Sequence, residues 1–242
     1  YFVTNIKIFT LSKAMLKKLL NLGFPSAMQM FFEVAIFTSA VWLSGILGKN
    51  PQAANQIALN LASMTFMVAM GFSVAAMIRV GNQKGLKNFR ELRRVAISIV
   101  LLTSILALVF AVFFILFNSE LPKIFLDYNS VADFADNVEV VTIAAQLLII
   151  AAIFQFTDAL QVVALGALRG MQDVKIPTVI CFIAYWIIGF PISYYLSMHT
   201  SLESMGIWYG LLAGLSASGI MLFIRFNYLS KKLIRQQLAI NN

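Results

Sequence analysis

Charged residues are scarce in this chain of 242 residues, at only 12% of the sequence. Soluble domains carry about a quarter charged residues, so this chain has too few to cover a surface that faces water. Hydrophobic residues make up 60% of the sequence and the mean hydropathy is +0.86. The composition therefore predicts an integral membrane protein.

Cysteine and histidine occur only once each, as Cys181 and His199. A single cysteine cannot form an intrachain disulfide, and we expect Cys181 to be a small buried apolar side chain. The sequence has no set of His and Cys at metal-ligand spacing, no nucleophile motif and no phosphate-binding loop. We therefore expect neither an enzyme nor a cofactor.

Acidic residues are outnumbered by basic ones, which gives a net charge of +8. A basic chain can bind nucleic acid, but here the basic residues alternate with apolar runs of membrane length and do not form one soluble face. Their distribution is typical of the loops of a membrane protein. We expect the lipid bilayer, and no nucleic acid, as partner.

Six apolar runs are long enough to cross a bilayer as helices. They cover residues 24–47, 53–78, 95–117, 140–165, 176–198 and 205–224. Helices satisfy their own backbone hydrogen bonds inside lipid, which irregular segments cannot do. The predicted fold is an all-α bundle of six transmembrane helices, and Pro191 is expected to kink the fifth.

The segments between these runs predict the topology. Sixteen Lys and Arg residues fall on the side of both termini and two, Lys49 and Lys123, on the other. By the positive-inside rule both termini are cytoplasmic, in a bacterial inner membrane. We divide the chain into a basic amphipathic segment (1–21) that suits an interfacial helix, the six-helix lobe (22–228) and a basic tail (229–242). The basic segment 79–94 is expected to form a short helix on the membrane surface.

Two carboxylates, Glu33 and Asp158, lie deep within the predicted spans. Burying a charged carboxylate in the bilayer centre costs about 2.5–3.5 kcal/mol on insertion scales, and such residues usually serve ion or proton pathways. Each lies ten residues from the cytoplasmic end of its span, or about 15 Å at the helical rise. Two acids at the same depth predict a shared site for Na⁺ or H⁺.

Polar side chains repeat at helical spacing around both acids. This pattern predicts a polar seam between the first, second and fourth spans, although a buried acid with a glutamine partner can also be a packing contact. Met64 and Met67 could adapt to ligands of many shapes or simply pack. The supporting candidates are Gln29, Gln56, Asn60, Ser63, Met64, Met67, Phe154, Gln155 and Gln161. Arg79 and Arg169 are expected to anchor cytoplasmic helix ends.

Three stretches resemble the C-terminal lobe of multidrug and toxic compound extrusion (MATE) transporters, in the NorM branch. They are GFPSAMQMFFEVAIFTSAVWLSGILG, AANQIALNLASMTFMVAMGFSVAAMIRVGNQKG and FQFTDALQVVALGALRGMQDVKIP, and the resemblance covers residues 20–228. It implies two six-helix lobes around a cleft, exchanging Na⁺ or H⁺ for cationic amphipathic drugs. The chain begins with Tyr1, and we expect a missing N-terminal lobe as its partner.

The resemblance also implies roles for particular residues. In the family, an acid in each of two spans contributes to the cation site, at the positions of Glu33 in QMFFEV and Asp158 in FQFTDALQ. Some members carry a tyrosine one turn before that aspartate, where this chain has Phe154, so the choice between Na⁺ and H⁺ stays open. The alternative function is a flippase for lipid-linked precursors, but such proteins need basic residues deep in the cavity, where none is expected here.

Overall fold

Helices account for nearly all of the described chain. The computed structural model describes residues 12–126 and 134–241, with no β-strand among them. The elements in order are α1 (Lys13–Leu47), α2 (Lys49–Gly85), α3 (Phe89–Leu116), a 3₁₀ helix η1 (Leu121–Phe125), α4 (Phe134–Gly170), α5 (Lys175–Phe182), a π-helix η2 (Ile183–Gly189), α6 (Phe190–His199) and α7 (Glu203–Asn241).

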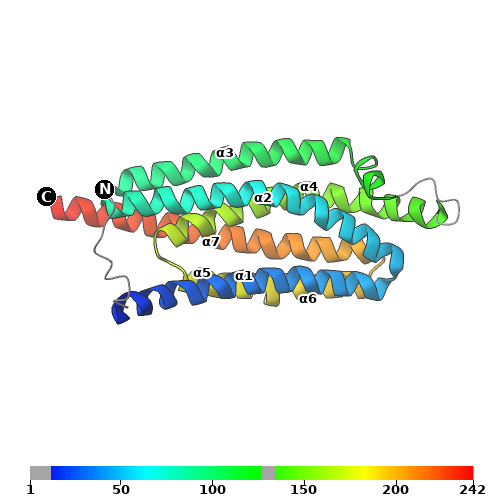
Figure 1. Ribbon diagram of the computed structural model, residues 1–242, viewed down its shortest axis with the longest axis horizontal. Helices are drawn as coiled ribbons and strands as arrows, with labels where there is room; N and C mark the ends of the chain where they lie inside the picture. Colours follow the sequence, from blue (N-terminus) through cyan, green and yellow to red (C-terminus); the bar gives the residue numbers. More distant parts are fainter. Residues whose placement is uncertain (1–11, 127–133, 242) are drawn as a thin grey trace, which may run out of the picture.

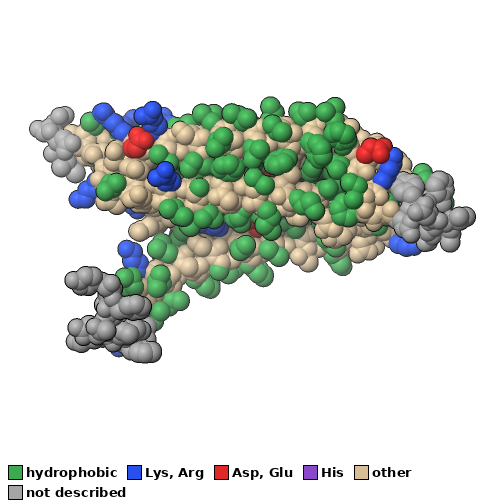
Figure 2. Space-filling view, turned by 45° about the horizontal axis from the view of Figure 1, so that its top comes forward, with side chains coloured by type: hydrophobic (Ala, Val, Ile, Leu, Met, Phe, Trp, Pro, Cys, Tyr) green, Lys and Arg blue, Asp and Glu red, His purple; other side chains and the backbone are tan. Residues whose placement is uncertain are grey.

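Six helical segments are long and apolar enough to cross a membrane, as the sequence predicts. The segments α5, η2 and α6 are continuous and make up the fifth, while the other five are single helices. The most apolar is α3, with a mean hydropathy of 3.1 over its best window. Hydrophobic side chains cover the middle of the visible face, and charged side chains gather mainly toward the two ends (Figure 2). The chain is a multi-pass membrane protein.

Several helices continue well beyond their apolar cores. Helix α1 begins at Lys13, where the Ser12 hydroxyl caps the Met15 N–H at 3.4 Å, and runs unbroken into the first span. The basic stretch before that span is therefore no separate interfacial helix in its described part; residues 7–11 lie outside the described residues. The expected surface helix within residues 79–94 is wrong, since α2 runs through to Gly85 and α3 begins at Phe89.

The turn between α1 and α2 is a single residue, Gly48. Its φ of 135° lies in a region that side chains with a Cβ rarely adopt, so glycine suits this abrupt reversal. Because α1 and α2 are joined so tightly, they run antiparallel with their Gly48 ends adjacent (Figure 1). The described ends of α1 and α7, which lead to the two termini, both lie at the opposite end of the bundle (Figure 1).

The bundle has two sides that meet at α7. Helices α2, α3 and α4 pack against one another on one side, while α1 lies beside α5 and α6 on the other (Figure 1). Helix α7 packs against both α4 and α6. Helix α1 contacts α2 only lightly for its length, and this leaves the space in which the candidate site lies.

Glycines allow two of these contacts to become very close. A Cβ on Gly166 of α4 would lie 2.2 Å from the Ser73 carbonyl oxygen of α2. A Cβ on Gly210 of α7 would lie 2.2 Å from the backbone nitrogen of Ser193 in α6. Each neighbouring serine also donates its hydroxyl across the contact, Ser73 to the Val162 carbonyl oxygen at 2.6 Å and Ser193 to that of Ile207 at 2.9 Å. Small residues let transmembrane helices approach closely enough for such bonds.

The irregularity expected near Pro191 takes the form of the π-helix η2. Its wider turns end at Gly189, and the Phe190 N–H donates to the Tyr185 carbonyl oxygen five residues earlier. Pro191 follows directly, and proline cannot donate a backbone hydrogen bond. The π-helix places the fully buried Tyr185 against α4, where its hydroxyl meets the Gln161 amide.

Candidate cation and substrate cavity

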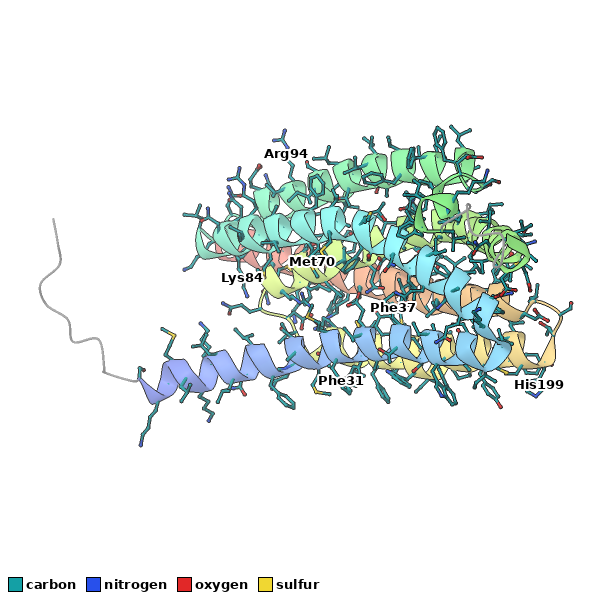
Figure 3. All side chains as sticks on the ribbon, turned by 45° about the vertical axis from the view of Figure 1, so that its right-hand side comes forward. Phe31, Phe37, Met70, Lys84, Arg94 and His199 are labelled. Atoms are coloured by element: carbon teal, nitrogen blue, oxygen red, sulfur yellow. The ribbon has the colours of Figure 1, made fainter. Side chains whose placement is uncertain are left out.

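A cavity of about 300 Å³ lies between α1, α2 and α4. We call it the main cavity. Phe37 and Met70 point from α1 and α2 toward this space, whereas Phe31 points away from it (Figure 3). Its lining residues are Met30, Glu33, Val34 and Phe37 of α1, Leu59, Asn60, Ala62, Ser63, Phe66 and Met70 of α2, and Phe154, Asp158, Val162, Leu165 and Arg169 of α4.

Glu33 and Asp158, the two acids predicted from the sequence, both line the main cavity. Asp158 is only 4% exposed and Glu33 is half-buried. The Glu33 Oε1 and Asp158 Oδ1 atoms are buried without a hydrogen-bond partner. Buried carboxylate oxygens without partners are a favourable environment for a proton or a small cation.

Helix α2 supplies neutral oxygens to the same cavity. Asn60 accepts a hydrogen bond from the Gln56 amide at 3.2 Å, and the Ser63 hydroxyl donates to the Asn60 carbonyl oxygen at 2.7 Å. The hydroxyl hydrogen of Ser63 is thus committed, which leaves its oxygen lone pairs free to accept. Asn60 and Ser63 could therefore add ligands to an ion held by Glu33 and Asp158.

Arg169 closes one end of the main cavity with a positive charge. Its Nε and Nη2 atoms donate to Gln29 Oε1 at 3.3 and 3.1 Å, and Gln29 Nε2 donates to the Val174 carbonyl oxygen at 3.2 Å. The pair ties α1 to the end of α4, as expected for a helix anchor. In addition, Arg169 lines the cavity and interacts electrostatically with Glu33, which the sequence reasoning missed.

The spacing of residues along the helices could have identified lining residues that the sequence did not suggest, such as Arg169, Met30 and Phe37. Asp158, Val162, Leu165 and Arg169 follow one another at intervals of four, three and four residues, so they share one face of α4. Arg169 lies three turns beyond Asp158 on that face. On α1, Met30 and Phe37 stand three residues before and four residues after Glu33, which places them beside it for the same reason.

Other predicted residues fall outside the main cavity. Gln29 is engaged by Arg169, Gln56 is exposed beside Asn60, and Gln161 donates to the Tyr185 hydroxyl. Met64 and Met67 are exposed, and two other methionines, Met30 and Met70, line the cavity. Gln155 lines a different and smaller cavity. The single predicted seam is therefore divided among several environments.

Phe154, predicted as a supporting residue of the site, packs among other aromatic side chains. Its ring lines the main cavity and meets Phe37 at 6.0 Å and Trp208 at 5.4 Å between ring centroids, both edge to face. The Trp208 indole in turn donates to Asn55 Oδ1 at 2.9 Å. Phe154 thus contributes an aromatic wall to the cavity.

Comparison with known proteins agrees with this architecture. The model of the family described as MatE matches residues 25–195, more than half of the chain. The chain belongs to the MatE family. MdtK of Proteus mirabilis, named as a multidrug resistance protein, is 38% identical over 221 residues, which are 90% of this chain and 46% of that protein. NorM of Aliivibrio fischeri, named likewise, is 35% identical over 93% of this chain and 48% of its own length.

The chain spans about half the length of the curated relatives it matches and corresponds to the C-terminal half of these MATE transporters. Its fold is that of a lobe in solved MATE structures. An outward-facing multidrug resistance MATE transporter of the MOP superfamily superposes with a TM-score of 0.82 at 17% identity, covering 96% of this chain and 50% of the other. The family and the bacterial relatives support a multi-pass protein of a bacterial inner membrane.

Proposed function

We propose that this chain is one lobe of a secondary antiporter that exports cationic amphipathic compounds in exchange for Na⁺ or H⁺. The observation that carries the proposal is the pair Glu33 and Asp158, two acids from different helices that line one mostly apolar cavity. The coupling cation would bind both acids, with Asn60 and Ser63 as neighbouring ligands. The family membership and the names of the relatives support the direction of transport.

The exchange is a competition for negative charge. A cationic substrate in the main cavity is attracted by Glu33 and Asp158, and its apolar part contacts Phe37, Phe66 and Met70. Loading of Na⁺ or H⁺ neutralises the acids, so it lowers the affinity for the substrate and shifts the population toward the state that releases it. The second lobe of the transporter would complete the cleft, and both termini of this chain would be cytoplasmic.

The test is export by the full-length protein that carries this chain, reconstituted in vesicles. Export of a fluorescent cationic dye is measured separately under a Na⁺ gradient and a pH gradient, for the wild type and for Glu33→Gln and Asp158→Asn. We expect each substitution to lower ion-driven export at least about tenfold, or about 1.4 kcal/mol at the rate-limiting barrier.

Asp136→Asn is the matched control. Asp136 does not line the main cavity, and it pairs at 3.4 Å with exposed Lys49, next to the Gly48 turn. This substitution should leave export under both gradients unchanged. Unchanged coupling in both Glu33→Gln and Asp158→Asn would sink the proposal, whichever gradient drives the wild type.

The alternative function, flipping of lipid-linked precursors, requires a cavity that attracts phosphate. The described lining of the main cavity has two carboxyl groups and one guanidinium, that of Arg169. This balance favours a cationic over an anionic cargo. Competition by a polyprenyl phosphate for dye export, with no competition by a second cationic dye, would reverse this choice.

A further inference from the structure

Asp158 borders a second, much smaller cavity that the proposed transport cycle does not use. This small cavity has a volume of about 20 Å³ and lies between α2, α3 and α4. Its polar lining consists of Thr65, Thr103, Gln155 and Asp158, and the rest is apolar. A cavity of this size holds about one water molecule.

Two of the polar residues around the small cavity, Gln155 and Asp158, have buried side-chain atoms without a hydrogen-bond partner. Gln155 is only 5% exposed, and neither its amide nitrogen nor its amide oxygen has a hydrogen bond. Gln155 lines the small cavity and not the main one. The Oδ1 atom of Asp158 is also buried without a partner. Buried polar groups in folded proteins are nearly always satisfied, by protein or by ordered water.

The two threonines offer acceptors only. The Thr65 hydroxyl donates to the Ala62 carbonyl oxygen at 2.8 Å, and the Thr103 hydroxyl donates to that of Ile99 at 2.8 Å. Their hydrogens are committed to their own helices, so only oxygen lone pairs remain for the cavity. The lining therefore presents one donor group, the Gln155 amide, and several oxygen acceptors.

This combination selects the occupant. A bare cation would satisfy the oxygens but would leave the Gln155 amide hydrogens unpaired, and an apolar molecule would satisfy nothing. A water molecule accepts from the amide and donates to two oxygens. We propose that the small cavity is a water site, in which one water joins Gln155 to Asp158, with Thr103, the more buried of the two threonines, as third partner.

The consequence for transport rests on the proposed function, whereas the water site does not. The water would give the Asp158 carboxyl a fixed partner on the α3 side that does not compete with an ion in the main cavity. Gln155 and Thr103 would then be positioning residues, holding Asp158 in orientation without touching the substrate.

The first test is the sign of a stability change. Gln155→Leu keeps the side-chain size but removes both amide atoms. If the cavity is dry, this substitution deletes two unsatisfied polar groups and should raise the thermal midpoint of the purified full-length protein. With a bound water it breaks the hydrogen bond from Gln155 to the water and weakens the hold on the water that Asp158 also bonds, so we expect the midpoint to fall by about 2–4 °C.

Thr103→Val and Thr157→Val form a matched pair. Both hydroxyls donate to a carbonyl oxygen of their own helix at 2.8 Å, but only Thr103 lines the small cavity. We expect a lower midpoint for Thr103→Val than for Thr157→Val. Equal midpoints, together with a raised midpoint for Gln155→Leu, would overturn the water site.

A structure of the wild-type protein that resolves ordered waters identifies the occupant. Density for one water between Gln155 and Asp158 supports the proposal, and an empty cavity contradicts it. Anomalous signal from Rb⁺ inside the small cavity would also overturn it, in favour of a second cation site. Because these measurements need no ion gradient, they are independent of whether Glu33→Gln and Asp158→Asn lose coupling.

Discussion

Helix α4 makes two kinds of contact with α2, and they differ over the length of the pair. Toward the end that carries Gly166 the helices touch closely, with the Ser73 hydroxyl bonded to the Val162 carbonyl oxygen. On the side that faces α1, the same two helices line the main cavity, with Asp158 in its wall. In the close contact the helices pack tightly and the serine hydroxyl is hydrogen-bonded. Beside the cavity, carboxyl oxygens of the two acids lack hydrogen-bond partners.

The difference indicates that the close contact holds the lobe together and that the main cavity is where a ligand can bind. Small residues and bonded hydroxyls give the close contact its stability in lipid, where apolar surface alone favours no association. The cavity instead gathers large flexible or aromatic side chains around two acids that are costly to bury. Substitutions in the close contact should therefore affect folding, and those in the cavity should affect transport.

The largest expected effect comes from filling the close contact. Gly166→Ala places a Cβ 2.2 Å from the Ser73 carbonyl oxygen, which must displace backbone, so we expect a loss of about 1–3 kcal/mol from overpacking. Gly71→Ala on α2 is the control, since nothing lies within 4 Å of its Cβ position. It should be neutral or stabilising, because alanine favours a helix more than glycine.

Thermal unfolding of the two glycine variants in detergent, beside the wild type, measures this comparison. Gly166→Ala should lower the midpoint by several degrees and Gly71→Ala should not. Equal midpoints for the two variants would mean that α2 and α4 are not in close contact there.

A smaller effect is expected at Arg169, which lines the main cavity and donates hydrogen bonds to Gln29 of α1. Arg169→Gln removes a positive charge that acts on Glu33, so we expect cations to bind more tightly, by about fivefold or 1 kcal/mol for a solvent-screened charge. Arg169→Lys keeps the charge and should leave cation affinity close to wild type. The measurement is the Na⁺ or H⁺ concentration that half-saturates dye exchange.

Both Arg169 variants weaken the contact to Gln29, so a general structural effect should appear in both. Weaker cation binding in Arg169→Gln, or the same change in Arg169→Lys, would contradict an electrostatic role. In that case Arg169 would act only as the anchor between α1 and α4.

The smallest effect distinguishes methionines inside and outside the cavity. Met70 lines the main cavity, whereas Met67, one turn earlier on α2, is 69% exposed. Met70→Ala should lower the export of bulky aromatic cations by about threefold, or under 1 kcal/mol of contact with a ligand. Met67→Ala should not change the substrate profile. Dye competition assays over cations of increasing size measure both, and equal profiles would remove Met70 from the substrate site.

The sequence was sufficient for the number of spans, because a span needs a certain length of apolar chain. That Glu33 and Asp158 line one cavity could be expected, because each lies about ten residues from the same end of the bundle. The ends of the helices could not be predicted as accurately as the number of spans. Hydropathy detects only the apolar part of a helix, and helices such as α2 (Lys49–Gly85) continue beyond that part.

The division of the polar residues required the structure. Gln155 and Asp158 stand one turn apart on α4, and only the position of α3 determines that Gln155 faces the small cavity. Similarly, Met64 and Met67 share helix α2 with Met70, but only Met70 turns toward the cavity. Sequence spacing gives the face of a helix, and the neighbours of that face are set by how the helices cross.

The π-helix η2 has a consequence for how the fifth span can change in evolution. Removing one residue from an ordinary helix turns everything beyond it by about 100° and breaks its contacts. A π-helix is wound with more residues per turn, so it can lose a residue and tighten to an α-helix while both flanks keep their orientation. Residues Ile183–Gly189 are therefore the part of the fifth span that can absorb a deletion. Such a deletion would change the hydrogen bond between Tyr185 and Gln161 of α4.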